Sequence, residues 1–179
     1  TAPSSPAQGD MWFNTSSSIV SGISSKALAA YNGTAWQKAT TGIVMTATGG
    51  TKRTSGLYTY HTFTSSGTFS VSQTAGIIDS LVIAGGGGGG HDNGGGGGAG
   101  GVVWTTSANV ATGNYTVTIG AGGAPSVAGG TNPAGSGANS IFKTATALGG
   151  GGAGGSSTNG ANGGSGGGGS RNRVGGSST

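Results

Sequence analysis

The chain has 179 residues, of which 45 are glycine and only 6% are charged, with a formal net charge of +4. It contains no Glu and few Leu or Lys, which disfavours a helix-rich domain and favours β and extended structure. The seven cations are mostly dispersed, whereas a nucleic-acid-binding protein would favour a basic stripe. With no cysteine, disulfides and cysteine-ligated metal sites are excluded.

Residues 1–40 are predicted to form a small aromatic β-hairpin unit. Short strands are expected at residues 11–14, 27–31 and 34–38, and Asn32-Gly33 is a strong two-residue hairpin signal between the last two. Trp12, Phe13, Tyr31 and Trp36 predict a small core, with a carbohydrate-binding aromatic surface as the alternative. Because so short a unit buries little surface alone, we expect it to pack on copies of itself or on a neighbouring subunit.

The string GDMWFNT…YNGTAWQ, over residues 9–37, resembles a short repeat of bacteriophage tail fibres and related virion proteins. It departs from that repeat by an expanded middle, residues 16–25. The resemblance implies a virion or extracellular location and a homo-oligomer, with a trimer preferred.

Residues 41–56 are polar and rich in threonine, and are predicted to be a linker or an irregular strand. A β plus glycine-rich domain is expected over residues 57–179. Its strands are predicted at residues 58–63, 68–71, 102–104, 114–119, 140–142 and 145–148 from alternation and apolar runs. Residues 77–83 are apolar on both faces apart from Asp79 and Ser80, which predicts a central strand. The expected fold class is therefore all-β.

Two glycine-rich blocks dominate this domain: residues 84–101, AGGGGGGHDNGGGGGAGG, and residues 149–176. Glycine loses much backbone freedom on folding and has no side chain to bury in return. A polyproline II strand makes no internal hydrogen bonds, so several such glycine strands can satisfy one another side by side. Interior positions would then be glycine, with other residues on the outer layer or at turns. A flexible Gly/Ser linker is the alternative.

The order of these elements resembles the glycine-rich domain of phage tail fibres and adhesins. The matching order is YHTFTSSGTFSV, an apolar strand ending in IAGGGGGG, then GGGGGAGGVV, YTVTIGAGG, GANSIF and a glycine-rich tail, over roughly residues 58–169. The resemblance implies a sandwich of polyglycine II strands whose end loops contact a host receptor.

No catalytic constellation emerges from the motifs. A G-x-G-x-x-G pattern within residues 85–90 and a G-x-S-x-G pattern at residues 163–167 both lack the flanking strand and helix that would give them meaning. His91 and Asp92 lack further metal ligands, and the carboxylates Asp10, Asp79 and Asp92 are scattered. We therefore expect no enzyme activity, no cofactor and no metal.

The loops between the glycine strands are the expected receptor-binding sites. Their candidate residues are His91, Asp92, Asn93, Thr131, Asn132, Asn159, Asn162, Arg171, Asn172 and Arg173. The expected partners are a host cell-surface glycan or outer-membrane protein and other virion proteins, with no nucleic acid and no membrane insertion, because no apolar run reaches 18 residues. The alternative is a structural subunit that polymerises into an extracellular filament or sheath.

Overall fold

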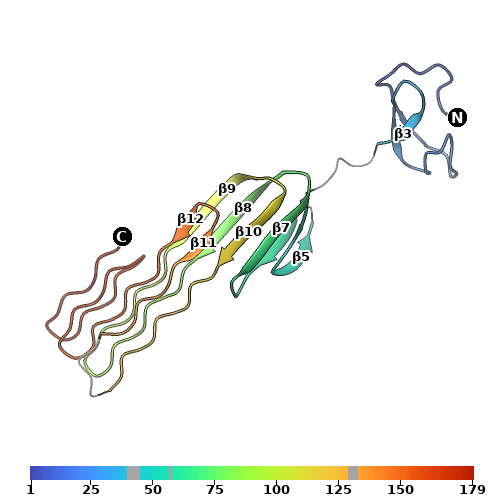
Figure 1. Ribbon diagram of the computed structural model, residues 1–179. Coiled ribbons are helices and arrows are strands. Elements are labelled where there is room, and N and C mark those ends of the chain that lie inside the picture. Colours follow the sequence, from blue (N-terminus) through green and yellow to red (C-terminus); the bar gives the residue numbers. More distant parts are fainter. Residues whose placement is uncertain (40–44, 57, 129–132) are drawn as a thin grey trace. The chain divides into compact units, whose positions relative to one another are not determined.

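The computed structural model describes residues 1–39, 45–56, 58–128 and 133–179, and within these ranges all regular structure is β (Figure 1). The predicted all-β class is confirmed. The described part of the chain holds no helix that could span a membrane. The chain divides into two compact units, Thr1–Val44 and Met45–Thr179.

The first unit is an antiparallel sheet of β1 (Met11–Phe13), β2 (Leu28–Tyr31) and β3 (Trp36–Lys38), in the order β1-β2-β3. Its centre is Trp36, whose ring centroid lies 5.6 Å from that of Trp12 and 5.4 Å from that of Tyr31. Ile23, Ala27 and Ala29 are buried with Trp36. The predicted aromatic core is confirmed, although Phe13 is 47% exposed and lies outside it.

The turn between β2 and β3 differs from the expected two-residue hairpin. Residues 32–35 all lie outside the strands, so the loop has four residues and the flanking Tyr31 pairs with Trp36. The Asn32 Oδ1 accepts hydrogen bonds from the backbone N–H groups of Thr34 (3.0 Å) and Ala35 (2.9 Å). Asparagine stabilises such turns by bonding to its own local backbone, and this local bonding accounts for the longer loop.

A single buried amide orders the expanded segment between β1 and β2. Asn14 is 1% exposed. Its Nδ2 donates to the carbonyl oxygens of Ser18 (2.9 Å), Ile23 (3.0 Å) and Ser24 (3.1 Å), while its Oδ1 accepts from the Ser16 backbone and hydroxyl. The segment therefore folds around one side chain that uses its donors and its acceptor on backbone groups that would otherwise be unsatisfied.

The second unit contains a five-stranded antiparallel sheet in the order β12-β11-β10-β7-β4, a β8-β9 pair and a β5-β6 pair. Its strands are β4 (Thr46–Thr48), β5 (Thr51–Ser55), β6 (Tyr58–Thr62), β7 (Gly67–Gln73), β8 (Gly76–Ile83), β9 (Val102–Val110), β10 (Gly113–Thr118), β11 (Ser140–Phe142) and β12 (Ala145–Ala147). Ala47, Phe69, Val71, Val110 and Val117 form the main core.

One expectation for this unit is refined and another needs correction. Residues 46–55, expected to be a linker or an irregular strand, form β4 and β5, as suits their β-branched threonines. The pairing of β4 with β7 shifts register between Thr46 and Ala47, whereas β5 pairs with β6 residue by residue. The strand over residues 77–83 is not central: in the described structure β8 pairs with β9 alone, and Ile77, Leu81 and Ile83 are exposed. Its inner face packs Val82 and Ala84 against Ala147. Although β8 has apolar residues on both faces, only one of these faces is buried in the described part of the single chain.

The strands lead directly into extended glycine-rich segments that run side by side (Figure 1). β8 continues into residues 84–90, residues 94–101 lead into β9, β10 continues into residues 119–128, residues 133–139 lead into β11, and β12 continues into residues 148–155. The tail adds residues 158–163, 164–170 and 173–179. None of these segments is a regular β-strand.

The hydrogen bonds of residues 84–90 repeat every three residues, as polyproline II geometry requires. The N–H groups of Ala84, Gly87 and Gly90 donate to Gly101, Gly98 and Gly95; those of Gly85 and Gly88 donate to Ala138 and Gly135; and the carbonyls of Gly86 and Gly89 accept from Gly123 and Ser126. These bonds measure 2.8 to 3.1 Å. The glycine segments are therefore ordered by their backbones, which confirms packing over the flexible-linker alternative.

Residues 149–155 form the buried centre of this packing. Their segment, 148–155, bonds to residues 84–90, 94–101, 133–139, 158–163 and 164–170. A Cβ added to Gly151 would lie 1.9 Å from the carbonyl oxygen of Ala161, and one added to Gly152 would lie 2.0 Å from that of Ala134. Glycine is needed at these positions for close backbone approach, because neither has a positive φ.

The expectation that every interior position is glycine is wrong at Ala134 and Ala153, which are 6% and 0% exposed. Two exposed polar side chains of residues 133–139 also bond to the buried segment. The N–H of Gly149 donates to Asn139 Oδ1 at 2.8 Å, and that of Gly152 donates to Ser136 Oγ at 3.1 Å. A small polar side chain on one segment can thus replace a backbone carbonyl as the acceptor of an N–H on the neighbouring segment. The two N–H groups served in this way are three residues apart, as are the two side chains that accept them.

Candidate functional site

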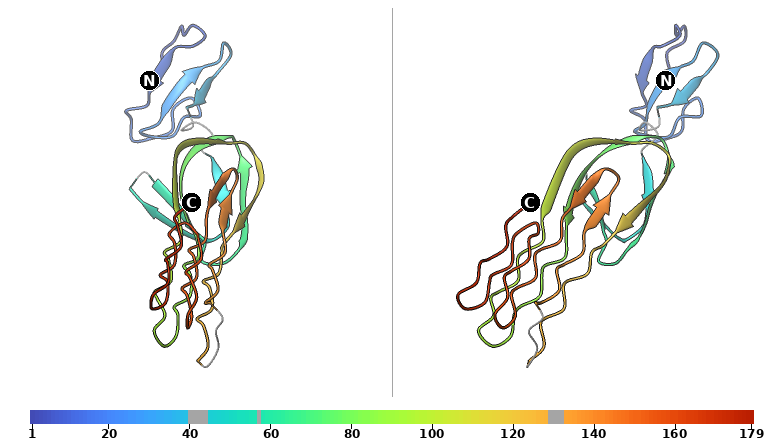
Figure 2. Two further views of the ribbon diagram at one scale, coloured as in Figure 1. Left: turned by 90° about the vertical axis from the view of Figure 1, so that its left-hand side faces the viewer. Right: turned by 60° about the vertical axis from the view of Figure 1, so that its left-hand side comes forward.

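The turns that follow the glycine-rich segments gather at the end of the second unit that lies away from its β-sheets (Figure 2). One turn contains residues 91–93 and another contains residues 171–172. These turns meet: the backbone N–H of Arg171 donates to the carbonyl oxygen of Asn93 at 3.1 Å. The backbone packing thus brings together two loops that the sequence marked as candidates.

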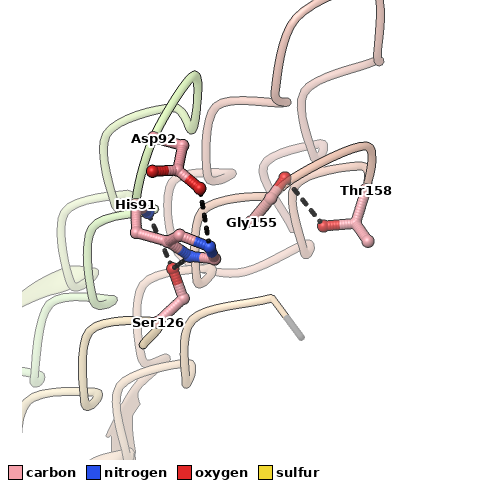
Figure 3. Close-up of polar contacts among 5 residues, drawn as sticks. All are labelled: His91, Asp92, Ser126, Gly155 and Thr158. Atoms are coloured by element: carbon pink, nitrogen blue, oxygen red, sulfur yellow. Dashed lines mark hydrogen bonds and ion pairs between the residues drawn. The ribbon is translucent and has the colours of Figure 1, made fainter. Parts of the chain in front are cut away.

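The loop at residues 91–93 is anchored through His91 (Figure 3). The Ser126 Oγ lies 2.8 Å from the backbone nitrogen of His91 and 2.8 Å from its Nδ1. The Nε2 of the same ring lies 3.2 Å from Asp92 Oδ2. Because the His91 side chain is 10% exposed and that of Asp92 is 60% exposed, His91 holds the loop while Asp92 faces solvent.

Asp92, His91 and Ser126 are the residue types of a nucleophilic triad, but their contacts indicate a structural role. The Ser126 oxygen accepts the backbone N–H of His91, which ties it into the loop rather than leaving it free to attack a substrate. The Asp92 backbone has a φ of 52°, a left-handed conformation that Asp tolerates in turns. In the described residues no three His, Cys, Asp or Glu side chains gather to hold a metal ion.

The loop at residues 170–173 is anchored in a similar way, by Ser170. This side chain is 5% exposed, and its Oγ and its backbone N–H both donate to the Thr158 carbonyl at 3.1 Å. Thr158 in turn donates its hydroxyl to the Gly155 carbonyl at 3.3 Å and closes the neighbouring turn (Figure 3). Arg171 and Arg173, in contrast, are exposed.

Asn159 and Asn162, expected in a loop, lie instead on an extended segment. The Asn159 Oδ1 accepts from the N–H of Val174 at 3.2 Å, and the Asn162 Oδ1 accepts from that of Ser177 at 2.7 Å. Both side chains therefore connect residues 158–163 to the C-terminal segment. Their placement in a loop between glycine strands was wrong, because the turn occupies residues 156–157.

The remaining candidates divide between the two touching loops and a stretch that the structure leaves undescribed. His91, Asp92, Asn93, Arg171, Asn172 and Arg173 lie in the touching loops. Thr131 and Asn132 lie outside the described residues. Sequence reasoning missed the anchors Ser126 and Ser170. The available signal was their position as the polar residue next to a turn in a glycine-rich segment.

A comparison with known protein families identifies the family of the second unit. A family model described as a glycine-rich domain matches residues 62–179, from the last residue of β6 through the C-terminal glycine segment. The chain belongs to the glycine-rich domain family. No curated protein and no solved structure matches the chain.

The exposed part of the glycine-rich domain's two joined loops has a distinct chemistry. Arg171 and Arg173 supply two guanidinium groups, Asp92 supplies one carboxylate, and Asn93 and Asn172 supply amides. Within the described residues the only ion pair formed by these charges is the His91–Asp92 contact. The guanidinium groups can therefore donate to a ligand, and the anchors beneath them keep the loop backbones in place.

Proposed function

We propose that this chain is a non-enzymatic virion fibre or adhesin component that presents the loops at residues 91–93 and 171–173 to a receptor on a host cell. The observation that carries the proposal is the backbone bond between Arg171 and Asn93 at the end of the ordered glycine packing. It makes one surface from two polar loops without any large core beneath them. A rigid surface of this kind loses little conformational entropy on binding.

The virion assignment is supported by the residues 9–37, which resemble a tail-fibre repeat. In such a particle the first unit would contact other virion proteins or further copies of the chain, and the loops would act outside the cell.

The partner that best suits the loops is a cell-surface glycan that bears carboxylate or phosphate groups. The planar guanidinium of arginine binds carboxylates and phosphates through paired N–H donors, and amides bind hydroxyl groups. Arg171 and Arg173 are exposed on the same turn, so both can reach one acidic sugar. An outer-membrane protein loop rich in acidic side chains offers the same chemistry and is the second receptor class to test.

The experiment is adsorption of the labelled chain to host cells. Arg171→Ser with Arg173→Ser should lower binding by about tenfold or more, since truncated hot-spot side chains typically cost at least that much. Lys52→Ser with Arg53→Ser removes the same charge from exposed positions on β5 and should leave binding unchanged. Equal adsorption by both double variants would refute a receptor site in these loops.

The alternative function, a structural subunit of an extracellular filament or sheath, is favoured by the exposed apolar residues of β8 and β9. A filament needs head-to-tail contacts that do not close, whereas a fibre tip closes on itself. Electron microscopy across a concentration series separates these roles. Filaments that lengthen with concentration would support the structural role, and particles of constant mass would support display.

A further inference from the structure

The outer face of the β8-β9 pair exposes large apolar side chains. Leu81 pairs directly with Trp104, and Ile83 pairs with Val102. Their exposed fractions are 52%, 63%, 56% and 61%, and Ile77 on β8 is 66% exposed. Five side chains of this size and exposure present on the order of 600 Å² of apolar surface, the range in which exposed patches mark interaction sites.

The glycine segments that continue these strands lack side chains at positions where the fold of the single chain would accept one. A Cβ added to Gly89 or Gly96 would meet nothing within 4 Å, and one added to Gly86 would meet only one atom, at 3.6 Å. None of these glycines has a positive φ. Neither internal crowding nor backbone conformation therefore explains glycine here, although close approach by another backbone from outside would.

The apolar side chains of β8 and β9 lie on the same side of the second unit as Gly86, Gly89 and Gly96. The inner face of β8 packs on Ala147 of β12. The N–H groups of Gly85 and Gly88 point to residues 133–139, and their carbonyls accept from Gly150 and Ala153. Because residues 133–139 lead into β11 and residues 148–155 follow β12, the inner side of residues 84–90 continues the inner side of β8. Gly86 and Gly89 use their carbonyls to accept from Gly123 and Ser126, at one edge of this segment. The direction of an added Cβ at these two glycines is open, which leaves their Cα positions for the outer side.

We propose that this outer face, made of Ile77, Leu81, Ile83, Val102 and Trp104 with Gly86, Gly89 and Gly96, pairs with the same face of a second copy of the chain. The patch together with the adjoining glycine strip approaches the roughly 800 Å² per partner of a standard stable interface. One self-complementary face generates a two-fold pair. This inference is independent of receptor binding by the loops.

The occupant is a second copy because the face carries almost no charge. Asp79 is the only charged residue in β8 and β9, and residues 84–90 and 94–101 contain none. The Asp79 Oδ1 accepts the N–H of Ser107 at 2.8 Å, which uses part of the carboxylate within the same chain. A charged partner would find nothing here to complement, whereas an apolar, uncharged surface complements itself.

Sedimentation velocity of the whole chain, across a concentration series reaching high micromolar, tests this pairing. The expected result is a reversible species of twice the chain's 16.6 kDa. Trp104→Glu should weaken the association constant about tenfold or more, because aromatic residues dominate such interfaces. Val174→Glu is the matched control, since Val174 is 70% exposed and lies outside the face.

Gly89→Leu tests the same face independently of the apolar patch. A Cβ at this position would meet nothing within 4 Å in the single chain, so the fold should persist with an unchanged Tm while association falls by a similar factor. A chain that stays monomeric across the series would overturn the proposal, and so would a trimer or an open filament. Association that persists undiminished in both Trp104→Glu and Gly89→Leu would also overturn it.

Discussion

The side-chain oxygen of Asn159 accepts a hydrogen bond of 3.2 Å from the backbone N–H of Val174. Three residues later Asn162 makes the same contact with Ser177, at 2.7 Å. The spacing on both partners equals the three-residue turn of polyproline II. Side chains can therefore join two such segments in register, as cross-strand pairs do in a β-sheet.

Replacing both asparagines by alanine should loosen the C-terminal segment without unfolding the domain. Each lost hydrogen bond is worth about 0.5–1.5 kcal/mol, and the N–H of Gly176 still donates to the Gly167 carbonyl. We expect hydrogen exchange at Val174 and Ser177 to become about two- to tenfold faster, since 1.4 kcal/mol corresponds to a factor of ten. Native-state hydrogen exchange measures this directly.

The control for this experiment is the conservative pair Asn159→Asp and Asn162→Asp. A carboxylate accepts the same N–H donors, so protection should return close to the wild-type level. Loss of protection in the aspartate pair equal to that in the alanine pair would show that the oxygen contacts do not hold the segment.

The glycine packing predicts opposite outcomes for two neighbouring substitutions. A Cβ at Gly87 would lie 2.1 Å from the Gly151 carbonyl oxygen, so Gly87→Ala must displace the backbone and should cost about 1–3 kcal/mol or more. A Cβ at Gly89 meets nothing within 4 Å, so Gly89→Ala should change stability by no more than about 0.5 kcal/mol. Thermal unfolding of the two variants at one low concentration compares them.

Gly96→Ala provides a second control, since it also has open space around the added Cβ. Equal midpoints for Gly87→Ala and both controls would mean that residues 84–101 behave as a flexible linker in solution.

The loop at residues 91–93 should depend on the hydroxyl of Ser126. Ser126→Ala removes the oxygen that contacts both the backbone nitrogen and the Nδ1 of His91, and should cost about 1 kcal/mol of stability with faster hydrogen exchange at His91. Ser126→Thr retains the hydroxyl and should restore protection. Ser177→Ala, at an exposed position, should leave the loop unaffected. Unchanged exchange at His91 in Ser126→Ala would contradict its role as the anchor.

Much of the fold followed from local sequence features. The clean alternation of residues 114–119 predicted β10, and the glycine blocks predicted backbone-ordered packing, because both depend on properties of the segment itself. β8 could not be placed correctly from its own residues. Whether an apolar face is covered depends on what packs over it, and among the residues that the structure describes only the inner face of β8 is covered.

The candidate site was predictable only in part, for a related reason. A polar residue in a three-residue repeat points to solvent or to a neighbouring segment depending on the relative rotation of the two segments. That rotation is set by contacts distant in the sequence, such as the bond between Asn162 and Ser177. Thus composition identified the loops at residues 91–93 and 171–173, but it could not show that they touch or that the Asn159 side chain bonds to the C-terminal segment.

Asn14 should be the most sensitive polar position of the first unit. Its Nδ2 serves the carbonyls of Ser18, Ile23 and Ser24 from a buried position, so Asn14→Ala leaves several groups unsatisfied and should cost about 1–3 kcal/mol or more. Asn14→Asp should not rescue, because a carboxylate cannot donate to these carbonyls. Asn32→Ala, which loses an exposed turn contact, should cost only about 1 kcal/mol. Hydrogen exchange at Ile23 and Lys26 reports on the segment between β1 and β2. Equal effects of Asn14→Ala and Asn32→Ala on exchange at these two residues would show that the buried amide does not organise that segment.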